Sequence, residues 1–569
     1  MSVVPRPHLP VRCQVPLANL PAPAARDPDR SAAVDEAALL VARARRVLAN
    51  GELAMSARPL LFGENGVYPQ FLARAQGCRV TDTTGRVYVD WLFGWGSVLL
   101  GYGRPEIGEA IGGQLGAAPT LTMPSPLEVE VAEKIVELVP CAEMVAFGKN
   151  GSDAVTAAVR LARAHTERDV ILHFGFHGFH DWFAVSNRAI RGIPTAFGGL
   201  THSFPFNDLE ALRALFARHP GRVAAVVMEP FREEIPRDGY LESVRDLAHE
   251  NGALLVFDEM VTGFRIARGG AQELTGVVPD LACLGKALAN GMPLSALVGP
   301  RRLMQGADSL GVDMTCRGET LSLACARAAL DLYAREPVSE RVADVGRRLA
   351  SGIHEEAARM RIPLSLVGHP ARMEIALEDC GAISGRAALG IFVQHCLERG
   401  VITNGLFLPS FSHDADAVDQ TLRAAREALQ RVRLAADGRT AALPPPFGPI
   451  TIGFLDSAAI AEGTLMIVGW ILARGDPPDS VELIDSGGRT VPAIPAPRPD
   501  VARVYPAVAG AERSGFYVEI AAPSNAAATW TLRARRAGRI VFRVRLVAGV
   551  RAYKRSFPRE LQEGHVVEI

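Results

Sequence analysis

Residues 253–265 read ALLVFDEMVTGFR, and this stretch decides the fold. Its first five residues are all apolar, a pattern typical of a short strand that is buried on both faces of a parallel sheet. The strand ends at Asp258, and open parallel sheets bind their ligands at the carboxyl ends of their strands. A carboxylate buried there needs a partner, which predicts either a ligand-binding residue or a capping or salt-bridged aspartate.

Further strands and helices surround this stretch. Apolar runs at 171–174 and 223–228 predict more buried strands, and helical patterns at 153–164, 208–217 and 241–251 separate them. Because strands and helices alternate, we expect an α/β fold with a mainly parallel central sheet.

The segment 147–154, FGKNGSDA, immediately precedes a strong helical pattern. A Gly-Ser pair at the start of a helix offers free backbone N–H groups, a hydroxyl and the positive end of the helix dipole. This combination suits a phosphate at Gly151 and Ser152. Taken alone, the segment is more simply explained by Ser152 or Asp153 capping the helix.

The segment 279–291, PDLACLGKALANG, places Lys286 between small and apolar residues. Burial lowers the pKa of a lysine, so that the amine becomes available as a nucleophile or for a Schiff base. The simpler alternative is a lysine whose long side chain reaches solvent.

Together, the three segments supply a phosphate cradle, a carboxylate for a pyridinium nitrogen and an amine for an imine, as pyridoxal 5'-phosphate requires. Their order and spacing resemble the class III, fold type I aminotransferases, and most of all the glutamate-1-semialdehyde 2,1-aminomutase branch. The resemblance covers about residues 51–434. It rests also on FHG at 176–178, MEP at 228–230, LGKALANGMP at 284–293 and RGETLSL at 317–323.

The resemblance implies the roles of the residues in the three segments. Lys286 would form the Schiff base with the cofactor and then act as the acid and base of the proton shift. Asp258 would pair with the protonated ring nitrogen. Gly151 and Ser152 would hold the phosphate.

The resemblance also implies roles for residues outside those segments. Thr320 would complete the phosphate site of a partner subunit, so a homodimer with shared active sites is expected. Phe176 would stack on the cofactor ring, and Glu229 would lie near the cofactor. Trp95 and Arg58 would bind substrate, unless Trp95 belongs to the core and Arg58 to the surface.

Four positions depart from the usual pattern of the family. Lys149-Asn150 stands where Asn-Ser is usual, which places an extra cation either beside the phosphate or pointing away from it. Phe176 lacks the hydroxyl that a tyrosine would supply. Val261 replaces the glutamine of many transaminases, which favours the aminomutase-like branch.

Two reactions fit these residues equally well. One is an aminotransferase that moves an amino group between an amino donor and a carbonyl acceptor, and the other is an intramolecular aminomutase of the glutamate-1-semialdehyde type. The extra C-terminal segment favours the aminotransferase, because a stand-alone aminomutase needs no such addition. A catalytically silent binding protein is disfavoured, since Lys286 and Asp258 are both present.

The chain is expected to divide into four parts. A poorly ordered tail (1–35) precedes the aminotransferase unit (36–434), whose large subdomain covers about 120–330 and whose small α+β subdomain comes from the flanking segments. A proline-rich linker (435–449) then leads to an all-β, sandwich-like accessory domain (450–569), which is predicted from short β-prone runs separated by Gly, Pro and Asp.

Composition limits the partners and the compartment. With 61 Lys and Arg against 62 Asp and Glu, the net charge of −1 argues against nucleic-acid and polybasic membrane binding. No apolar run approaches the roughly 20 residues of a membrane span, and no secretory signal is recognisable. The eight cysteines include no C-x-x-C pair, so we expect reduced thiols in the cytoplasm and neither a disulfide framework nor a metal site. The expected partners are therefore small-molecule amines and carbonyl compounds.

Overall fold

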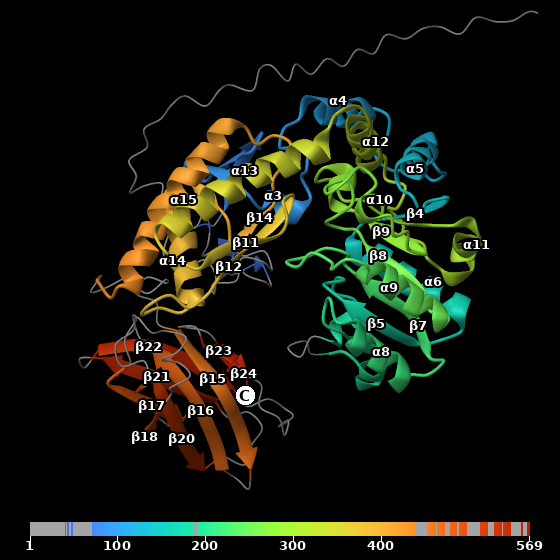
Figure 1. Ribbon diagram of the computed structural model, residues 1–569. Helices are drawn as coiled ribbons and strands as arrows, with labels where there is room; N and C mark the ends of the chain where they lie inside the picture. The colour runs from blue at the N-terminus through green and yellow to red at the C-terminus, as the bar shows by residue number, and fades with distance from the viewer. Residues whose placement is uncertain are drawn as a thin grey trace, which may run out of the picture.

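A computed structural model describes residues 71–186 and 192–439, a few positions between 40 and 48, and, from residue 452 onward, chiefly the strands of a C-terminal domain (Figure 1). Most of the helix expected before residue 49 lies outside the described residues, as does Arg58.

The central sheet contains seven described strands, in the order β4-β10-β9-β8-β7-β5-β6. These strands are β4 (Met144–Gly148), β5 (Val170–Phe174), β6 (Thr201–Ser203), β7 (Val223–Met228), β8 (Leu254–Asp258), β9 (Leu281–Leu284) and β10 (Ser295–Gly299). Only β10 runs against its neighbours, because it pairs antiparallel with both β4 and β9, whereas β9, β8, β7, β5 and β6 pair in parallel. The mainly parallel sheet predicted from the sequence is confirmed.

Helices cover both faces of this sheet (Figure 1). One face packs against α6 (Gly151–Thr166), whose apolar side contains Val155, Ala158 and Leu161. The other face packs against α8 (Leu209–Arg218) and α9 (Tyr240–Glu250). Since both faces are covered, every residue of β7 and β8 is buried, and all of them except Asp258 are apolar.

Two smaller sheets and three long helices form a second α+β layer. One sheet has the order β1-β2-β3-β13 and the other β11-β12-β14. The strands are β1 (Leu72–Gln76), β2 (Arg79–Asp82), β3 (Val87–Asp90), β11 (Leu364–His369), β12 (Arg372–Leu377), β13 (Val401–Ile402) and β14 (Leu406–Phe407). The helices are α13 (Val338–Arg359), α14 (Gly385–Glu398) and α15 (Ala415–Ala436). The parallel pair β3–β13 brings residues far apart in the sequence into one sheet.

The remaining helices connect these layers or border the site. They are α3 (Phe93–Gly96), α4 (Pro105–Leu115), α5 (Pro126–Leu138), α7 (Asp181–Ala184), α10 (Ala271–Thr275), α11 (Arg301–Met304) and α12 (Thr320–Arg335). Short 3-10 turns occur at η2 (Thr195–Gly199), η3 (Lys286–Ala289) and η4 (Ala307–Leu310).

The C-terminal domain consists of two five-stranded sheets, in the orders β19-β20-β16-β15-β23 and β18-β17-β21-β22-β24. The strands are β15 (Ile452–Ala461), β16 (Thr464–Leu472), β17 (Ser480–Asp485), β18 (Thr490–Pro492), β19 (Ile494–Ala496), β20 (Gly515–Ala521), β21 (Thr529–Arg536), β22 (Arg539–Val547), β23 (Arg559–Leu561) and β24 (Val566–Glu568). Alternate residues are buried in both sheets, such as Phe516 and Val518 in β20 and Leu532 and Ala534 in β21. This period of two is that of a sheet with one covered face, and it agrees with the predicted all-β, sandwich-like domain.

Within the described part of the chain, no helix combines the length and the apolar character that crossing a membrane requires.

Candidate functional site

The candidate site lies at the carboxyl edge of the parallel strands, where open α/β sheets bind ligands. Residues at or after the ends of five strands of the central sheet meet there. Gly151 follows β4, His177 follows β5, Glu229 follows β7, Asp258 ends β8, and Lys286 follows β9.

The phosphate cradle is the start of α6. The carboxylate of Asp153 accepts hydrogen bonds from the backbone N–H groups of Lys149 (3.2 Å) and Asn150 (2.7 Å), so Asp153 fixes the loop, as the capping alternative requires. Ser152 has a different role, because its Oγ accepts a hydrogen bond from the Phe179 backbone N–H at 3.2 Å. The first backbone N–H groups of a helix have no partner within it, so those of Gly151 and Ser152 are free to bind an anion.

Met260 lies between the cradle and the lysine loop. A Cβ atom at Gly151 would lie 3.0 Å from Met260 Sδ, and one at Gly285 would lie 2.6 Å from the same atom. The phosphate cradle and the loop of Lys286 are more than 130 residues apart in the sequence, yet both approach the side chain of Met260. Gly285 is the residue directly before Lys286.

Gly178 provides the first testable prediction, because its φ of +100° favours glycine and a Cβ atom there would lie 2.0 Å from Ser152 Oγ. We expect Gly178→Ala to displace Ser152 and to weaken cofactor binding by at least about 10-fold, since a non-glycine residue at such a φ already costs about 1–2 kcal/mol. The measurement is equilibrium titration of the apo-protein with pyridoxal phosphate. Gly112→Ala in α4 is the matched control, because a Cβ atom there has no neighbour within 4 Å. Equal affinities for the two variants would contradict the prediction.

Asp258 is buried and held from two sides. Its Oδ2 lies 2.8 Å from His177 Nδ1, and its Oδ1 accepts a hydrogen bond from the Met260 backbone N–H at 3.0 Å. The other nitrogen of the ring, His177 Nε2, lies 3.0 Å from the Phe174 carbonyl oxygen. Each ring nitrogen of His177 therefore lies within hydrogen-bond distance of an oxygen atom, which fixes the ring between the ends of β5 and β8. The sequence analysis did not identify His177 as a site residue, although it lies in the quoted FHG motif.

Lys286 has a left-handed backbone conformation, with φ of +46°. Such strain in a non-glycine residue persists only when the surrounding structure imposes it, and it is concentrated at functional sites. Burial lowers the pKa of the Lys286 amine, while Glu229 and Asp258 oppose this shift and the arginines Arg265 and Arg372 favour it.

Glu229 joins the end of β7 to the loop after β5. Its Oε1 accepts a hydrogen bond from the Phe176 backbone N–H at 2.7 Å. Burial, with a smaller effect of Asp258, raises the pKa of Glu229. The Phe176 ring is 53% exposed and contacts the Phe183 ring edge to face, with 5.5 Å between the centroids. About half of Phe176 is therefore accessible at the surface.

Trp95 lies in the short helix α3, which Arg265 contacts. The Trp95 backbone has φ of +61°, and its side chain is only partly buried. The next residue, Gly96, accepts a hydrogen bond through its carbonyl oxygen from Arg265 Nη2 at 3.0 Å. The structure therefore places Trp95 outside the fully buried core.

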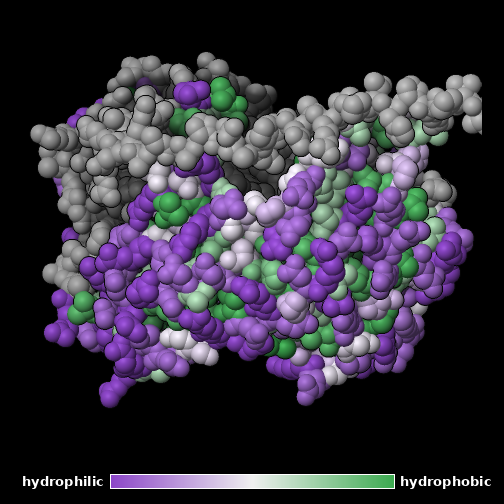
Figure 2. Space-filling view, turned by 90° about the horizontal axis from the view of Figure 1, so that it is seen from above, coloured by the Kyte–Doolittle hydropathy of each residue, from purple (hydrophilic) through white to green (hydrophobic). Residues whose placement is uncertain are grey.

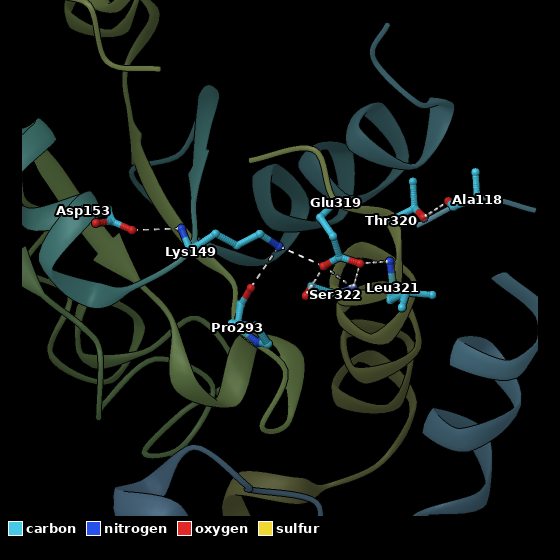
Figure 3. A network of polar contacts seen from close by, with 8 residues as sticks. All are labelled: Ala118, Lys149, Asp153, Pro293, Glu319, Thr320, Leu321 and Ser322. Carbon is cyan, nitrogen blue, oxygen red and sulfur yellow. Dashed lines mark hydrogen bonds and ion pairs between the residues drawn. The ribbon is translucent and has the colours of Figure 1, made fainter. Parts of the chain in front are cut away.

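Lys149 and Thr320 lie on neighbouring elements (Figure 3). Lys149 Nζ extends from the cradle to Glu319, with 2.9 Å to Oε2, and to the Pro293 carbonyl oxygen at 3.1 Å. Its charge is therefore paired and does not face the phosphate cradle. Thr320 is fully buried at the start of α12, and its Oγ1 donates a hydrogen bond to the Ala118 carbonyl oxygen at 2.6 Å.

These features fit pyridoxal phosphate. Gly151 and Gly178 have no side chains that would fill the cradle. Ser152 supplies a hydroxyl beside the free N–H groups. Asp258 supplies a buried carboxylate and Lys286 an amine of lowered pKa on the neighbouring strand. A fold and a site of this kind define a fold type I enzyme dependent on pyridoxal phosphate.

The chain belongs to the aminotransferase class-III family, whose model matches residues 63–425. It is 34% identical over 403 residues to a glutamate-1-semialdehyde 2,1-aminomutase of Syntrophobacter fumaroxidans, covering 65% of this chain and 92% of that one. It is 35% identical over 333 residues to a 3-aminobutyryl-CoA aminotransferase of Cloacimonas acidaminovorans, covering 57% and 79% of the two chains. Among solved structures, the internal aldimine form of the FumI protein of Sphingopyxis sp. MTA144 has a TM-score of 0.66 and 31% identity, covering 71% of this chain and 98% of that one. The predicted enzyme class, amino-group transfer, and the predicted cofactor are thus confirmed.

Proposed function

We propose that the protein is an aminotransferase that moves an amino group from an amino donor to a separate carbonyl acceptor. Amino-group transfer is carried by the placement of Lys286 and Asp258 at the ends of two adjacent parallel strands, and the separate acceptor is favoured by the additional C-terminal domain. When bound, pyridoxal phosphate supplies a ring that withdraws electrons from the reacting carbon.

Each of the site residues has a proposed task. Lys286 binds the cofactor covalently through Nζ, and afterwards Nζ takes up and returns the proton that moves during the reaction. Asp258, supported by His177, holds a proton on the ring nitrogen. Gly151 and Ser152 bind the phosphate.

The aromatic and acidic residues complete the proposed site. Phe176 covers one face of the cofactor ring, and Glu229 fixes the Phe176 backbone in place. Trp95 and Arg58 contact the substrate.

We further propose a homodimer in which Thr320 completes the phosphate site of the partner. Thr320 is tied to Ala118, and the segment around Ala118 carries exposed apolar side chains at Leu115, Leu121, Met123, Val129 and Val136. Figure 2 shows one face of the molecule, which is mostly hydrophilic with scattered hydrophobic residues. A second copy of the chain would cover them, and the mass of the protein in solution tests this.

An intramolecular aminomutase is the second candidate, and the similarity to glutamate-1-semialdehyde 2,1-aminomutases supports it. The C-terminal domain and the similarity to a 3-aminobutyryl-CoA aminotransferase favour the aminotransferase. The deciding experiment supplies glutamate-1-semialdehyde without any other amine and measures 5-aminolevulinate. Little product in that assay, together with turnover when an amino donor and a carbonyl acceptor are both supplied, supports the aminotransferase. Sustained turnover without a donor overturns it.

Two proposals concern location and domain limits. All seven cysteines in the described part of the chain are free thiols, which supports a reducing compartment such as the cytoplasm. The chain is proposed to divide into the catalytic unit (36–434), the linker (435–449) and the accessory domain (450–569), as the sequence predicts.

A further inference from the structure

Lys149 extends from the loop before the phosphate cradle to the first turn of α12 (Figure 3). Its backbone N–H donates to Asp153 at 3.2 Å, within the loop that leads into α6. At the other end of the side chain, Nζ lies 2.9 Å from Glu319 Oε2 and 3.1 Å from the Pro293 carbonyl oxygen. The Lys149 and Glu319 side chains are only 16% and 17% exposed, so water and salt screen this ion pair less than a pair at the surface.

Glu319 is the residue that caps α12. Its Oε1 accepts a hydrogen bond from the Leu321 backbone N–H at 2.5 Å, and its Oε2 accepts bonds from the backbone N–H and the hydroxyl of Ser322, at 3.2 and 2.6 Å. A negative charge at this place is stabilised by the positive end of the helix dipole. Burial alone would raise the pKa of Glu319, but hydrogen bonds from Ser322 and Lys149 hold it below its ordinary value. Helix α12 therefore begins with an anion.

The cap of α12 and the phosphate cradle make opposite demands on the local charge. The cradle at Gly151 and Ser152 is proposed to bind a phosphate ester, which carries about −1.5 to −2 charges near pH 7. One lysine side chain and one hydrogen bond separate the Glu319 carboxylate from the loop that leads into this cradle. At such a separation two anions that are poorly exposed to water repel each other. An uncompensated Glu319 would thus weaken phosphate binding.

The ammonium group of Lys149 is placed to remove this repulsion, because it lies against Glu319 and is held there by the Pro293 carbonyl oxygen. We propose that Lys149 is a positioning residue for cofactor binding: it neutralises the carboxylate that caps α12, and the neighbouring cradle can then accept a phosphate dianion. Lys149 acts through Glu319 and not by touching the phosphate. The proposal rests on the proposed function, in which Gly151 and Ser152 hold the phosphate, and it involves binding only.

A comparison of pyridoxal phosphate with pyridoxal tests the role of Lys149. Both compounds react with a lysine through the same aldehyde, and only one of them carries phosphate. Apo-protein is titrated with each compound, and the absorbance of the bound form gives the two dissociation constants. We expect Lys149→Met to bind pyridoxal phosphate at least about 10-fold more weakly and pyridoxal within about 3-fold of wild type, because only the phosphate is repelled. Equal losses for both compounds, or no loss for either, overturn the proposal.

Removal of the acid should cancel the effect of removing the lysine. Glu319→Gln keeps a side-chain oxygen for the cap of α12 and loses the charge, so we expect the double variant Lys149→Met/Glu319→Gln to bind pyridoxal phosphate within about 3-fold of wild type. Added salt should also narrow the gap between Lys149→Met and wild type, since salt screens the repulsion. If the double variant binds as weakly as Lys149→Met, or if salt leaves the gap unchanged, the ion pair only holds the two loops together and the proposal is wrong.

Lys134→Met is the matched control for a loosened helix. Lys134 Nζ lies 2.5 Å from Asp331 Oδ1, so this pair also ties a neighbouring helix, α5, to α12, but towards the opposite end of α12. The control should keep both affinities. If it loses as much affinity for pyridoxal phosphate as Lys149→Met, loosening of α12 explains the loss and the proposal is wrong.

The same titrations distinguish this inference from the proposed function. They need no turnover, so the result does not depend on which reaction the protein catalyses. If wild type prefers pyridoxal phosphate, and Ser152→Ala lowers this preference while Lys149→Met leaves it unchanged, the cradle stands and the inference about Lys149 fails. If wild type binds pyridoxal and pyridoxal phosphate equally, the cradle does not hold the phosphate, and both the proposed role of Ser152 and the inference are wrong.

Discussion

Replacing Lys286 by alanine should abolish the visible absorbance of the bound cofactor and lower kcat by roughly 10⁴-fold or more, because one side chain supplies both covalent binding and proton transfer. No other lysine can substitute: among the described residues, Lys149 is paired with Glu319, and Lys134 is paired with Asp331. The measurements are the absorbance spectrum after dialysis and the steady-state rate. Lys134→Ala is the control and should match the wild type in both.

The lowered pKa of Lys286 adds a pH dependence to this prediction. The amine reacts in its neutral form, and burial makes it lose its proton at a lower pH than an ordinary lysine, whose pKa is about 10.4. The rate at which apo-protein takes up pyridoxal phosphate should therefore rise as pH increases through the lowered pKa and reach its plateau before the ordinary value. A visible cofactor band that persists in Lys286→Ala, or uptake that keeps rising through the ordinary lysine pKa, would contradict the assignment.

The sequence predicted the backbone of the site well, because its signals are local. Five consecutive apolar residues before Asp258 require a doubly covered strand, and a parallel strand places its last residue at the ligand-binding edge. The helical pattern locates Gly151 and Ser152 in a similar way, because these two residues begin the helix α6. These inferences need only short stretches of chain and the general geometry of an α/β sheet.

The direction of individual side chains could not be predicted in this way. Whether Lys149 faces the phosphate cradle or turns away depends on Glu319, which lies 170 residues later in the sequence. The carboxylate of Glu319 accepts a hydrogen bond from Lys149 Nζ and pairs with its charge. His177 and Asp258 are 81 residues apart in the sequence. His177 follows β5 and Asp258 ends β8, and β7 lies between these two strands in the sheet.

Replacing Asp258 by asparagine tests the second largest contribution to the reaction. The asparagine keeps the shape of the side chain but removes the charge that would hold a proton on the cofactor ring. We expect kcat/KM to fall by roughly 10³-fold, within the range of 10² to 10⁴ found when a positioned proton-transfer or charge partner is removed. The cofactor content of the variant, determined separately by release of pyridoxal phosphate, should stay near that of the wild type because Lys286 and the cradle are intact.

The hydrogen bonds of Asp258 make this experiment specific. An asparagine can accept from the Met260 backbone N–H through its carbonyl oxygen and face the His177 ring with its NH₂, so Asp258→Asn changes chiefly the charge. His177→Gln is the matched control, because it weakens the support of Asp258 but keeps its charge, and we expect a loss of only about 10-fold. If Asp258→Asn lost no more activity than His177→Gln, the carboxylate charge would be unimportant, and Asp258 would serve only to fix the loops at the ends of β5 and β8. A loss about 100-fold greater in Asp258→Asn would instead show that the charge itself, held at the carboxyl edge of a buried strand, drives the chemistry.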